Sequence, residues 1–362
     1  MKSVLLKLFG VAVSAAIIAY LVWDARHNKL FAQLVQQQKD WVLLAGAWAA
    51  NMAAVVVSFV RWYYLVRALG LPFRLRDAFR LGFLGYLFNF VSLGSVGGDL
   101  FKAIFIAREQ PKRRAEAVAT VFVDRLIGLY ALLVIASVSI LVTGLVWAPQ
   151  PKIRTLSYVT LLSTGIGGIL VLMVLIPGFT SGAVSEALGA IPRVGPTIRR
   201  LIMAVRIYRS KPAVLLGAGA LSVVVQSLAT VGVYLVGLGL PGRVPSLGAH
   251  FVIIPLAMVS GLLPLPFMGL GAFEAVVEYL YRHLPGNAVI AEGQGLIVSL
   301  GYRVVTIAIA AVGACVWLAS RREVAELIHE AKELESDTST SANHALPTAS
   351  RDSPSSEPSA TA

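Results

Sequence analysis

The stretches LGFLGYLFNFVSLGSVGG (residues 81–98) and GAHFVIIPLAMVSGLLPLPFMGLGAFEAVVEYLY (residues 248–281) are long and apolar, yet glycine or proline breaks each of them. In lipid, an unpaired backbone N–H or C=O is so costly that a broken helix survives at membrane depth only against other protein or a wet cavity. Two such breaks in corresponding places mark the binding site of many transporters. The two stretches therefore predict a transporter-like membrane protein.

The composition of the whole chain is that of an all-α polytopic membrane protein. Of its 362 residues, 57% are hydrophobic and 14% are charged, and the mean hydropathy is +0.76. About 20 apolar residues suffice to cross roughly 30 Å of hydrocarbon. With the two broken stretches we count eight hydrophobic segments, about six of them full spans and two of them re-entrant. The predicted full spans are residues 3–23, 41–66, 115–147, 155–176, 213–240 and 295–319.

The net charge of +12 comes from basic residues that gather at 61–80, 102–114 and 193–211 and near both ends of the chain. Basic segments that flank membrane spans lie in the cytoplasm, so we expect both termini there and no nucleic-acid partner. Cytoplasmic clusters then flank residues 81–98 on both sides, whereas residues 248–281 must begin and end outside. Each broken stretch returns to the side from which it entered.

A span, a broken segment and a second span occur in this order twice, in opposite directions, at residues 41–147 and 213–319. Inverted repeats of this kind characterise many transporters. We predict one membrane domain over residues 1–322 and a cytoplasmic tail over residues 323–362. From Ser336 onward the tail is rich in Ser, Thr, Pro and Ala, which predicts that it is largely disordered.

The sequence offers no catalytic or metal-binding set of residues. The histidines are scattered, and no glycine cluster precedes a Lys-Ser/Thr pair or a βαβ pattern. Cys315 is the single cysteine and lies in the last apolar span, so neither an intrachain disulfide nor a thiol metal site can form. We therefore expect no enzymatic activity, no cofactor and no metal.

Glycines and charges meet at the end of the first broken stretch. Gly97 and Gly98 leave backbone N–H groups bare at the start of the next helix, a natural cradle for phosphate. Lys102 follows one turn later, and Arg108 lies further along. Asp99 would repel an anion, so we expect it to cap the helix or to hold Lys102. The alternative is an ordinary helix cap beside solvated charges.

Asp124 and Arg125 lie about ten residues into the apolar run 115–147. Ionisable groups inside a bilayer are costly and mark functional sites by default. Adjacent residues on a helix point about 100° apart, so we expect each to seek a partner on a neighbouring helix. The alternative is a pair of charges at the membrane boundary.

The last span contains Tyr302 and Arg303 in its first third. An arginine that faces the bundle can bind phosphate through two parallel hydrogen bonds, although it can also snorkel outward. Asn51 and Gln226 are both in mid-span, where polar side chains bond between helices.

The second broken stretch frees backbone amides and carbonyls where proline and glycine interrupt its helix. Glu274 follows in the first turn of the next segment, where it caps the helix or serves the site. Glu278 and Arg282 lie four residues apart on one helix face, a spacing suited to an ion pair. The interrupting residues are Pro264, Pro266, Gly269 and Gly271.

Taken together, these four places resemble the lysylphosphatidylglycerol synthase transmembrane region family, whose members are also called flippase-like domain proteins. The resemblance covers about residues 10–320. Its motifs are Gly97-Gly98-Asp99 running to Ala107-Arg108, Asp124-Arg125, Pro264-Leu265-Pro266 leading to Gly269-Leu270-Gly271 and Glu274, and Tyr302-Arg303.

Two departures from the family pattern alter the reach of a charge and keep its sign. Glu usually precedes the arginine where this chain has Asp124, and Arg often stands where this chain has Lys102. The family takes its name from members with a soluble aminoacyl-transferase domain after the membrane region. Only residues 323–362 follow Arg322 here, so lysyl transfer to a lipid is not expected of this chain.

Residues and resemblance together lead to the hypothesis of a bacterial cytoplasmic (inner) membrane protein that moves an anionic lipid between leaflets. The lipid would be a phospholipid or a polyprenyl phosphate. Arg125, Arg303 and Lys102 would attract its phosphate, while Asp99 and Glu274 hold the basic residues or the helix starts. Further partners would be a second copy of the chain or enzymes of envelope biosynthesis.

Two other functions stay open. The chain could be a non-transporting scaffold subunit of envelope lipid biosynthesis, or an intramembrane lipid-modifying transferase. Against the transferase, no long extramembrane loop could hold a donor, and no acidic or histidine cluster suits a metal.

Overall fold

The computed structural model describes residues 38–91, 97–175, 208–260, 271–284 and 290–319. The described residues form nine α-helices and one short 3-10 helix, with no strand among them, which confirms the all-α prediction. The chain divides after Val316 into two compact units, and the contacts below belong to the first. The predicted first span (3–23) and the predicted tail (323–362) lie outside the described residues.

Within the described ranges, five helices are long and apolar enough to cross a membrane. At 1.5 Å per residue, a helix of 28 residues reaches about 42 Å, more than the roughly 30 Å of hydrocarbon. They match five of the six predicted spans: α3 (Trp41–Ala68), α6 (Arg114–Val142), α7 (Pro151–Leu175), α10 (Pro212–Gly239) and α14 (Gln294–Ala319).

Local sequence explains where several of these helices begin and end. Asp40 accepts hydrogen bonds from the backbone N–H groups of Val42 (2.9 Å) and Leu43 (3.1 Å), and so caps the start of α3. Pro212 is the first residue of α10, a position where the missing N–H costs nothing. Gly144 has a φ of 70°, and this left-handed turn after α6 leads into the 3-10 helix η1 (Leu145–Trp147).

Helices α3 and α10 run antiparallel and form the most extensive helix pair described. The Asp40 N–H at the start of α3 donates to the Gly239 carbonyl at the end of α10 (3.1 Å). At the opposite end, the Tyr208 hydroxyl, just before α10, donates to the Leu65 carbonyl (2.9 Å).

The first broken stretch contributes to a hairpin of two short helices, α4 (Leu75–Val91) and α5 (Gly97–Glu109), which pack against each other. The Gln110 side-chain amide, just after α5, donates to the Pro72 carbonyl, just before α4, at 2.8 Å. The chain therefore leaves this hairpin where it enters. Residues 92–96, which join the helices, lie outside the described residues.

The second broken stretch has the same form. Helices α11 (Leu247–Ser260) and α13 (Ala272–His283) pack against each other. His250 Nε2, near the start of α11, lies 2.7 Å from the Tyr281 hydroxyl near the end of α13, so these two helices are also antiparallel. The connection over residues 261–270 is outside the described part of the chain.

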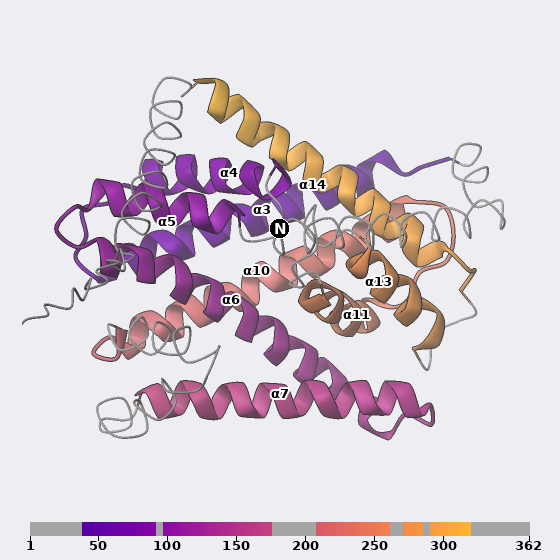
Figure 1. Ribbon diagram of the computed structural model, residues 1–362. Helices are drawn as coiled ribbons and strands as arrows, with labels where there is room; N and C mark the ends of the chain where they lie inside the picture. Colours follow the sequence, from indigo (N-terminus) through magenta and orange to yellow (C-terminus); the bar gives the residue numbers. More distant parts are fainter. Residues whose placement is uncertain (1–37, 92–96, 176–207, 261–270, 285–289, 320–362) are drawn as a thin grey trace, which may run out of the picture. The chain divides into compact units, whose positions relative to one another are not determined.

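The open end of a hairpin is the end at which the chain enters and leaves it. The open ends of the two hairpins lie at opposite ends of the α3–α10 pair. The hairpin of α4 and α5 follows the end of α3, whereas the hairpin of α11 and α13 follows the end of α10, and Figure 1 shows them in the left and right halves of the view. None of these four helices exceeds 17 residues, or about 26 Å, which is short of a membrane span. Two short hairpins at opposite ends of a helix pair are what an inverted repeat requires. The re-entrant path of the hairpins through lipid and the boundaries of the repeats stay predictions.

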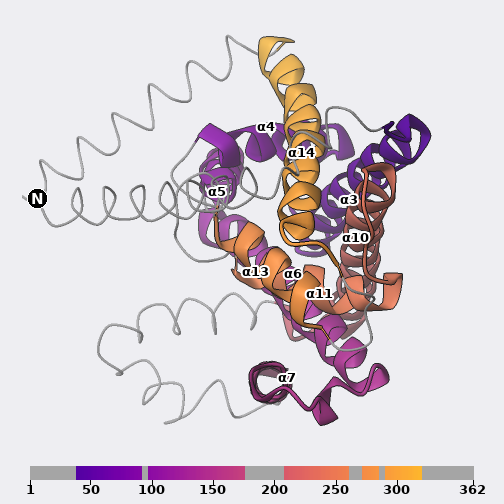
Figure 2. The same ribbon diagram turned by 90° about the vertical axis from the view of Figure 1, so that its right-hand side faces the viewer.

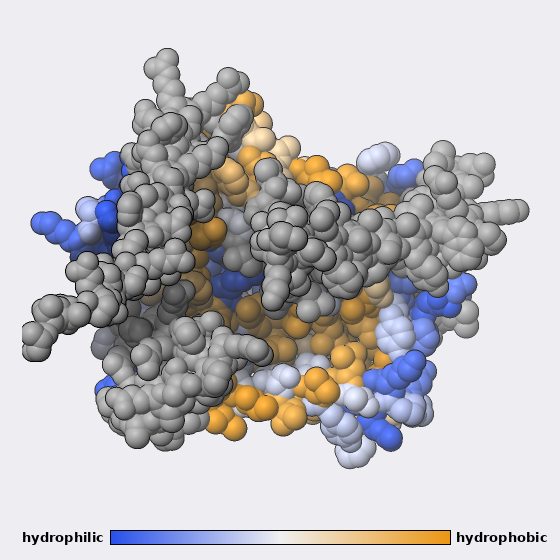
Figure 3. Space-filling model, in the orientation of Figure 1, coloured by the Kyte–Doolittle hydropathy of each residue, from blue (hydrophilic) through white to orange (hydrophobic). Residues whose placement is uncertain are grey.

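Seven of the described α-helices contribute to the buried apolar core of the first unit. Of these, α7 contributes only Ile153; it packs mainly against α6 and η1 and lies at the edge of the bundle (Figure 2). On the face shown in Figure 3, hydrophobic residues of the described helices fill the middle and hydrophilic residues lie toward both ends, as a membrane protein requires. Core residues include Ala47 (α3), Ala136 (α6), Val233 (α10), Ile253 (α11), Val277 (α13) and Val298 (α14).

We predict that Gly98→Ala destabilises the protein. A Cβ at Gly98 would lie 2.0 Å from the Gly85 carbonyl oxygen, so α5 would have to move away from α4. Overpacking of this kind costs about 1 to 3 kcal/mol, which thermal unfolding in detergent would detect. Gly217→Ala in α10 is the matched control, because a Cβ there meets no atom within 4 Å. Equal melting temperatures for the two variants would contradict the close approach of α4 and α5.

Candidate functional site

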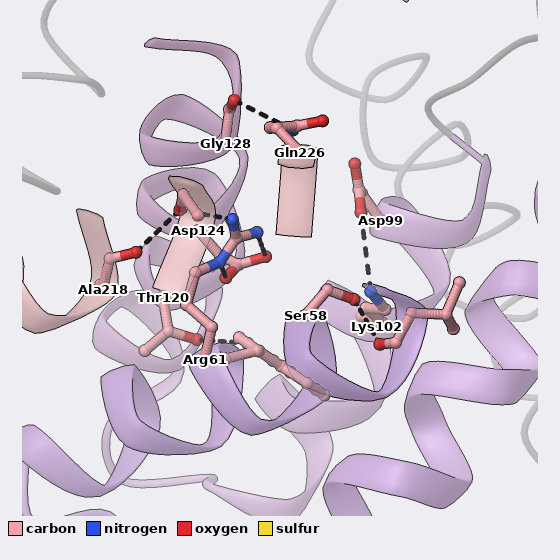
Figure 4. Close-up of polar contacts among 12 residues, drawn as sticks. Ser58, Arg61, Asp99, Lys102, Thr120, Asp124, Gly128, Ala218 and Gln226 are labelled. Carbon is pink, nitrogen blue, oxygen red and sulfur yellow. Dashed lines mark hydrogen bonds and ion pairs between the residues drawn. The ribbon is translucent and has the colours of Figure 1, made fainter. Parts of the chain in front are cut away.

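A buried ion pair joins α3 to α6 (Figure 4). Arg61 Nε donates to Asp124 Oδ1 at 2.7 Å, and Arg61 Nη2 donates to Asp124 Oδ2 at 3.0 Å. The side chains are only 7% and 15% exposed. Two parallel hydrogen bonds between a guanidinium and a carboxylate form the strongest geometry for such a pair.

A third helix completes this pair. Arg61 Nη1 donates to the Ser222 hydroxyl of α10 at 2.6 Å, and Ser222 in turn donates to the Ala218 carbonyl at 2.7 Å. Gly128 on α6 leaves room for the guanidinium, since a Cβ there would lie 3.3 Å from Nη1. Arg61 therefore ties α3, α6 and α10 together from inside the bundle.

The prediction that Arg61 belongs to the cytoplasmic basic cluster at residues 61–80 is wrong. The hydrogen bonds of Arg61 to Asp124 and Ser222 place it inside the helix bundle instead. A signal was present in the sequence, because Arg61 falls inside the predicted span 41–66. Its partner Ser222 carried no signal, since a serine in an apolar run is common.

A second cluster surrounds Asp99, the third residue of α5. Arg125 of α6 donates from Nη1 to Asp99 Oδ2. Lys102 Nζ lies 4.0 Å from Asp99 Oδ1, one turn further along α5 (Figure 4). Asp99 and Arg125 are more exposed than the Arg61 pair, at 22% and 29%, whereas Lys102 at 15% is as exposed as Asp124. Asp99 thus meets two cations from two helices.

The structure confirms that Asp124 and Arg125 each find a partner on a neighbouring helix, as their 100° separation predicted. Asp124 points to α3 and Arg125 points to α5. It also confirms that Asp99 holds Lys102, although the stronger contact of Asp99 with Arg125 was not foreseen.

Aromatic rings line the Lys102 ammonium. Nζ lies 5.5 Å from the ring centroid of Trp62 and 5.7 Å from that of Phe59, within the range of a cation–π interaction. Gly85 of α4 makes room for the stem, because a Cβ there would lie 2.8 Å from Lys102 Cε.

One of the two glycine N–H groups at the start of α5 already has a hydrogen-bond partner. The Gly98 N–H donates to the Asn89 side-chain carbonyl of α4 at 2.8 Å. The expected phosphate cradle of bare amides is therefore wrong at Gly98. This bond instead fixes the start of α5 against α4 and so positions Asp99.

The second half of the chain repeats the acid–arginine arrangement. Glu274 is the third residue of α13, and its Oε1 accepts from Arg303 Nε of α14 at 2.8 Å. Its other oxygen accepts from the Gly271 N–H at 2.7 Å, where Gly271 has a φ of 96° and caps α13. Glu274 is therefore both a helix cap and an ion-pair partner. The side chains of Glu274 and Arg303 are 2% and 13% exposed, so this pair is more deeply buried than the pair of Asp99 and Arg125.

The predicted pairing of Glu278 with Arg282 is wrong. Glu278 accepts from the Gly293 N–H (2.7 Å) and the Leu296 N–H (3.0 Å), and so caps the start of α14. Arg282 pairs with Glu292 instead. Orphan N–H groups at a helix start compete well for a carboxylate, and the spacing within α13 alone could not reveal them.

The remaining predicted residues have separate outcomes. Gln226 donates to the Gly128 carbonyl of α6 at 3.4 Å, which confirms a bond between helices, whereas Asn51 donates to Ala47 within its own helix. Arg108 is exposed in the last turn of α5, about 13 Å along the axis from Asp99. Pro264, Pro266 and Gly269 lie outside the described residues.

Among the described residues, no group of three His, Cys, Asp or Glu side chains could hold a metal ion. The clusters around Asp99 and Glu274 consist of acids, arginines, one lysine and aromatic rings. Such groups can bind an anion or exchange partners.

Comparisons with known proteins agree with the fold. A family model described as the lysylphosphatidylglycerol synthase TM region matches residues 7–313. A UPF0104 membrane protein of Methanocaldococcus jannaschii is 24% identical over 127 residues, which is 35% of this chain. That match spans 36% of the relative's own length, or about a third of it.

We predict that Arg61→Leu costs about 3 to 5 kcal/mol of stability, because it leaves the Asp124 carboxylate buried without its cation. Thermal unfolding in detergent would measure the loss. The double variant Arg61→Leu with Asp124→Leu should recover most of it, since well-packed apolar residues can replace a buried pair.

The control for this experiment is Glu116→Gln, which breaks the exposed pair of Arg113 and Glu116 at the start of α6. We expect little change there, because exposed pairs contribute little. A melting temperature of the Arg61 variant equal to that of the control would show that the buried pair does not stabilise the bundle.

Proposed function

The chain belongs to the lysylphosphatidylglycerol synthase TM region family, and from this premise we propose that it binds an anionic lipid and moves it between the two leaflets. It is an integral membrane protein with several apolar helices. We further propose that it resides in a bacterial cytoplasmic membrane, with both termini in the cytoplasm. The lipid would be a phospholipid or a polyprenyl phosphate.

The observation that carries the proposal is the same acid–arginine pair in both halves of the molecule. In each half the acid is the third residue of the short helix after the break, and the arginine lies on the next long helix. The pairs are Asp99 with Arg125 and Glu274 with Arg303. Charges at membrane depth are costly and are retained where they serve transport.

The chemistry of these pairs suits a phosphate ligand. A guanidinium binds carboxylate and phosphate through the same planar arrangement of donors. A lipid phosphate could therefore replace the acid at either arginine, while the displaced acid keeps a role at the helix start, as Glu274 does with the Gly271 N–H. Each arginine would then have two states, one bound to its acid and one bound to the lipid phosphate.

The positions of the two hairpins suggest which side of the molecule each exchange would open. The hairpins open toward opposite ends of the antiparallel helices α3 and α10. Transporters that alternate access open one side of a central site at a time. We propose that exchange at Asp99–Arg125 opens the side of α4 and α5, and that exchange at Glu274–Arg303 opens the side of α11 and α13.

We predict that Arg125→Gln and Arg303→Gln each slow lipid movement by about tenfold or more. A hydrogen bond to a charged group is worth about 1.5 to 3 kcal/mol, and 1.4 kcal/mol corresponds to a factor of ten. The measurement uses purified protein in phosphatidylcholine vesicles with trace fluorescent phosphatidylglycerol, and follows quenching of the outer leaflet by dithionite.

The matched control is Arg113→Gln, which removes an arginine from an exposed pair on the same helix as Arg125. Gel-filtration profiles of all variants test whether they fold, and Arg125→Lys provides a charge-preserving variant. Movement at the control rate in both Arg125→Gln and Arg303→Gln would reject the assignment. Stable lipid binding by the wild type with no movement in vesicles would favour a scaffold instead.

A further inference from the structure

We propose that Lys102 makes the first contact with the lipid phosphate, before any exchange at the arginines, and that the preferred ligand is a phosphodiester lipid with a single negative charge. This assignment rests on the proposed function and deepens it, because it names one ammonium and one class of headgroup. It also separates Lys102 from the arginines, which the sequence analysis had placed in the same role.

Arg61, Arg125 and Arg303 are each bound to a carboxylate of another helix. Arg61 makes two hydrogen bonds with Asp124, and Arg303 donates to Glu274 at 2.8 Å. Arg125 donates to Asp99. In the resting arrangement these guanidinium groups hold helices together.

Lys102 differs from the arginines in the quality of its pairing. Its Nζ lies 4.0 Å from Asp99 Oδ1, and that oxygen's carboxylate already accepts from Arg125. At 4.0 Å the contact is an ion pair without a hydrogen bond, since N–H···O bonds lie between about 2.7 and 3.2 Å. An ammonium has three N–H donors, so Lys102 can accept an anionic ligand without first losing a short bond.

The surroundings hold this ammonium in place, and within the described part of the chain its Nζ donates no hydrogen bond. Trp62 and Phe59 present ring faces to Nζ, which attract a cation and accept no strong hydrogen bond. The side chain is 15% exposed, and its stem lies beside Gly85, where any Cβ would collide with Cε. A charged donor in a mostly buried place favours an anionic acceptor.

Charge balance selects the class of headgroup. Asp99 offers one negative charge to Arg125, and Lys102 brings one further positive charge to the same carboxylate. A phosphodiester carries one negative charge and would compensate Lys102. A phosphomonoester carries about 1.5 to 2 negative charges at neutral pH, and its excess charge would face Asp99 within the same cluster.

The test is a binding measurement on the full chain in detergent with three probes. They are radiolabelled phosphatidylglycerol as the monoanionic diester, phosphatidic acid as the monoester, and soluble glycerophosphoglycerol as the same diester without acyl chains. We expect the wild type to bind phosphatidylglycerol at least tenfold more tightly than phosphatidic acid. Glycerophosphoglycerol should compete only weakly, whereas competition at similar affinity would show a free phosphodiester as the ligand and overturn the lipid assignment.

Lys102→Gln should weaken phosphatidylglycerol binding by tenfold or more, and Lys102→Arg should retain the preference for the diester. Lys152→Gln is the matched control, because Lys152 is exposed in the first turn of α7. Asp99→Asn removes one negative charge from the cluster, so it should shift the preference toward phosphatidic acid. Wild-type affinity in Lys102→Gln, or a wild-type preference for the monoester, would overturn the proposal.

These outcomes are distinct from failure of the proposed function. If Lys102→Gln binds and moves phosphatidylglycerol like the wild type, the Lys102 assignment fails and lipid movement stands. If the wild type binds phosphatidylglycerol through Lys102 and moves no lipid, the transport function fails and the binding site stands. A normal gel-filtration profile for Lys102→Gln, together with binding retained in Lys102→Arg, shows that loss in Lys102→Gln is an effect of charge.

Discussion

A charge inside an apolar helix bundle has to be paired, and among the described residues three such ion pairs each join two different helices. Arg61 binds Asp124 across α3 and α6, Arg125 binds Asp99 across α6 and α5, and Arg303 binds Glu274 across α14 and α13. Because removal of one partner would leave a buried charge uncompensated, these pairs fix where the short helices lie against the long ones. The geometry of both hairpins depends on them.

Both halves of the molecule contain an acid–arginine pair at the start of a short helix, but the two pairs differ in how deeply they are buried. In the second half, Glu274 is fully engaged by Arg303 and by the Gly271 N–H, and its side chain is almost completely buried. In the first half, the Asp99 carboxylate is shared between Arg125 and a more distant Lys102. The first half therefore carries one more cation than its counterpart at the equivalent helix start. The additional cation in the first half is Lys102, the residue that we propose makes the first contact with the lipid phosphate.

Much of the fold follows from composition, because spans of apolar residues and the glycines that break them are local features. The pairing of Asp124 and Arg125 with different helices also followed from their 100° separation. Partners that lie far apart in sequence could not be predicted. Arg61 was assigned to the cytoplasm since it adjoins a basic cluster, and Glu278 was given to Arg282 since the start of α14 was not known to approach it. The bond of the Gly98 N–H to Asn89 likewise exists only once α4 and α5 pack together.

The most direct measurement is a density map of the protein in a lipid nanodisc that contains phosphatidylglycerol. We predict headgroup density beside α5, with the phosphate within about 3 Å of Lys102 Nζ, the distance of an N–H···O hydrogen bond. The same map should show two hairpins that enter from opposite faces. Uninterrupted crossings in place of the hairpins, with Arg125 directed at acyl chains and no phosphate near Lys102, would contradict the central claim.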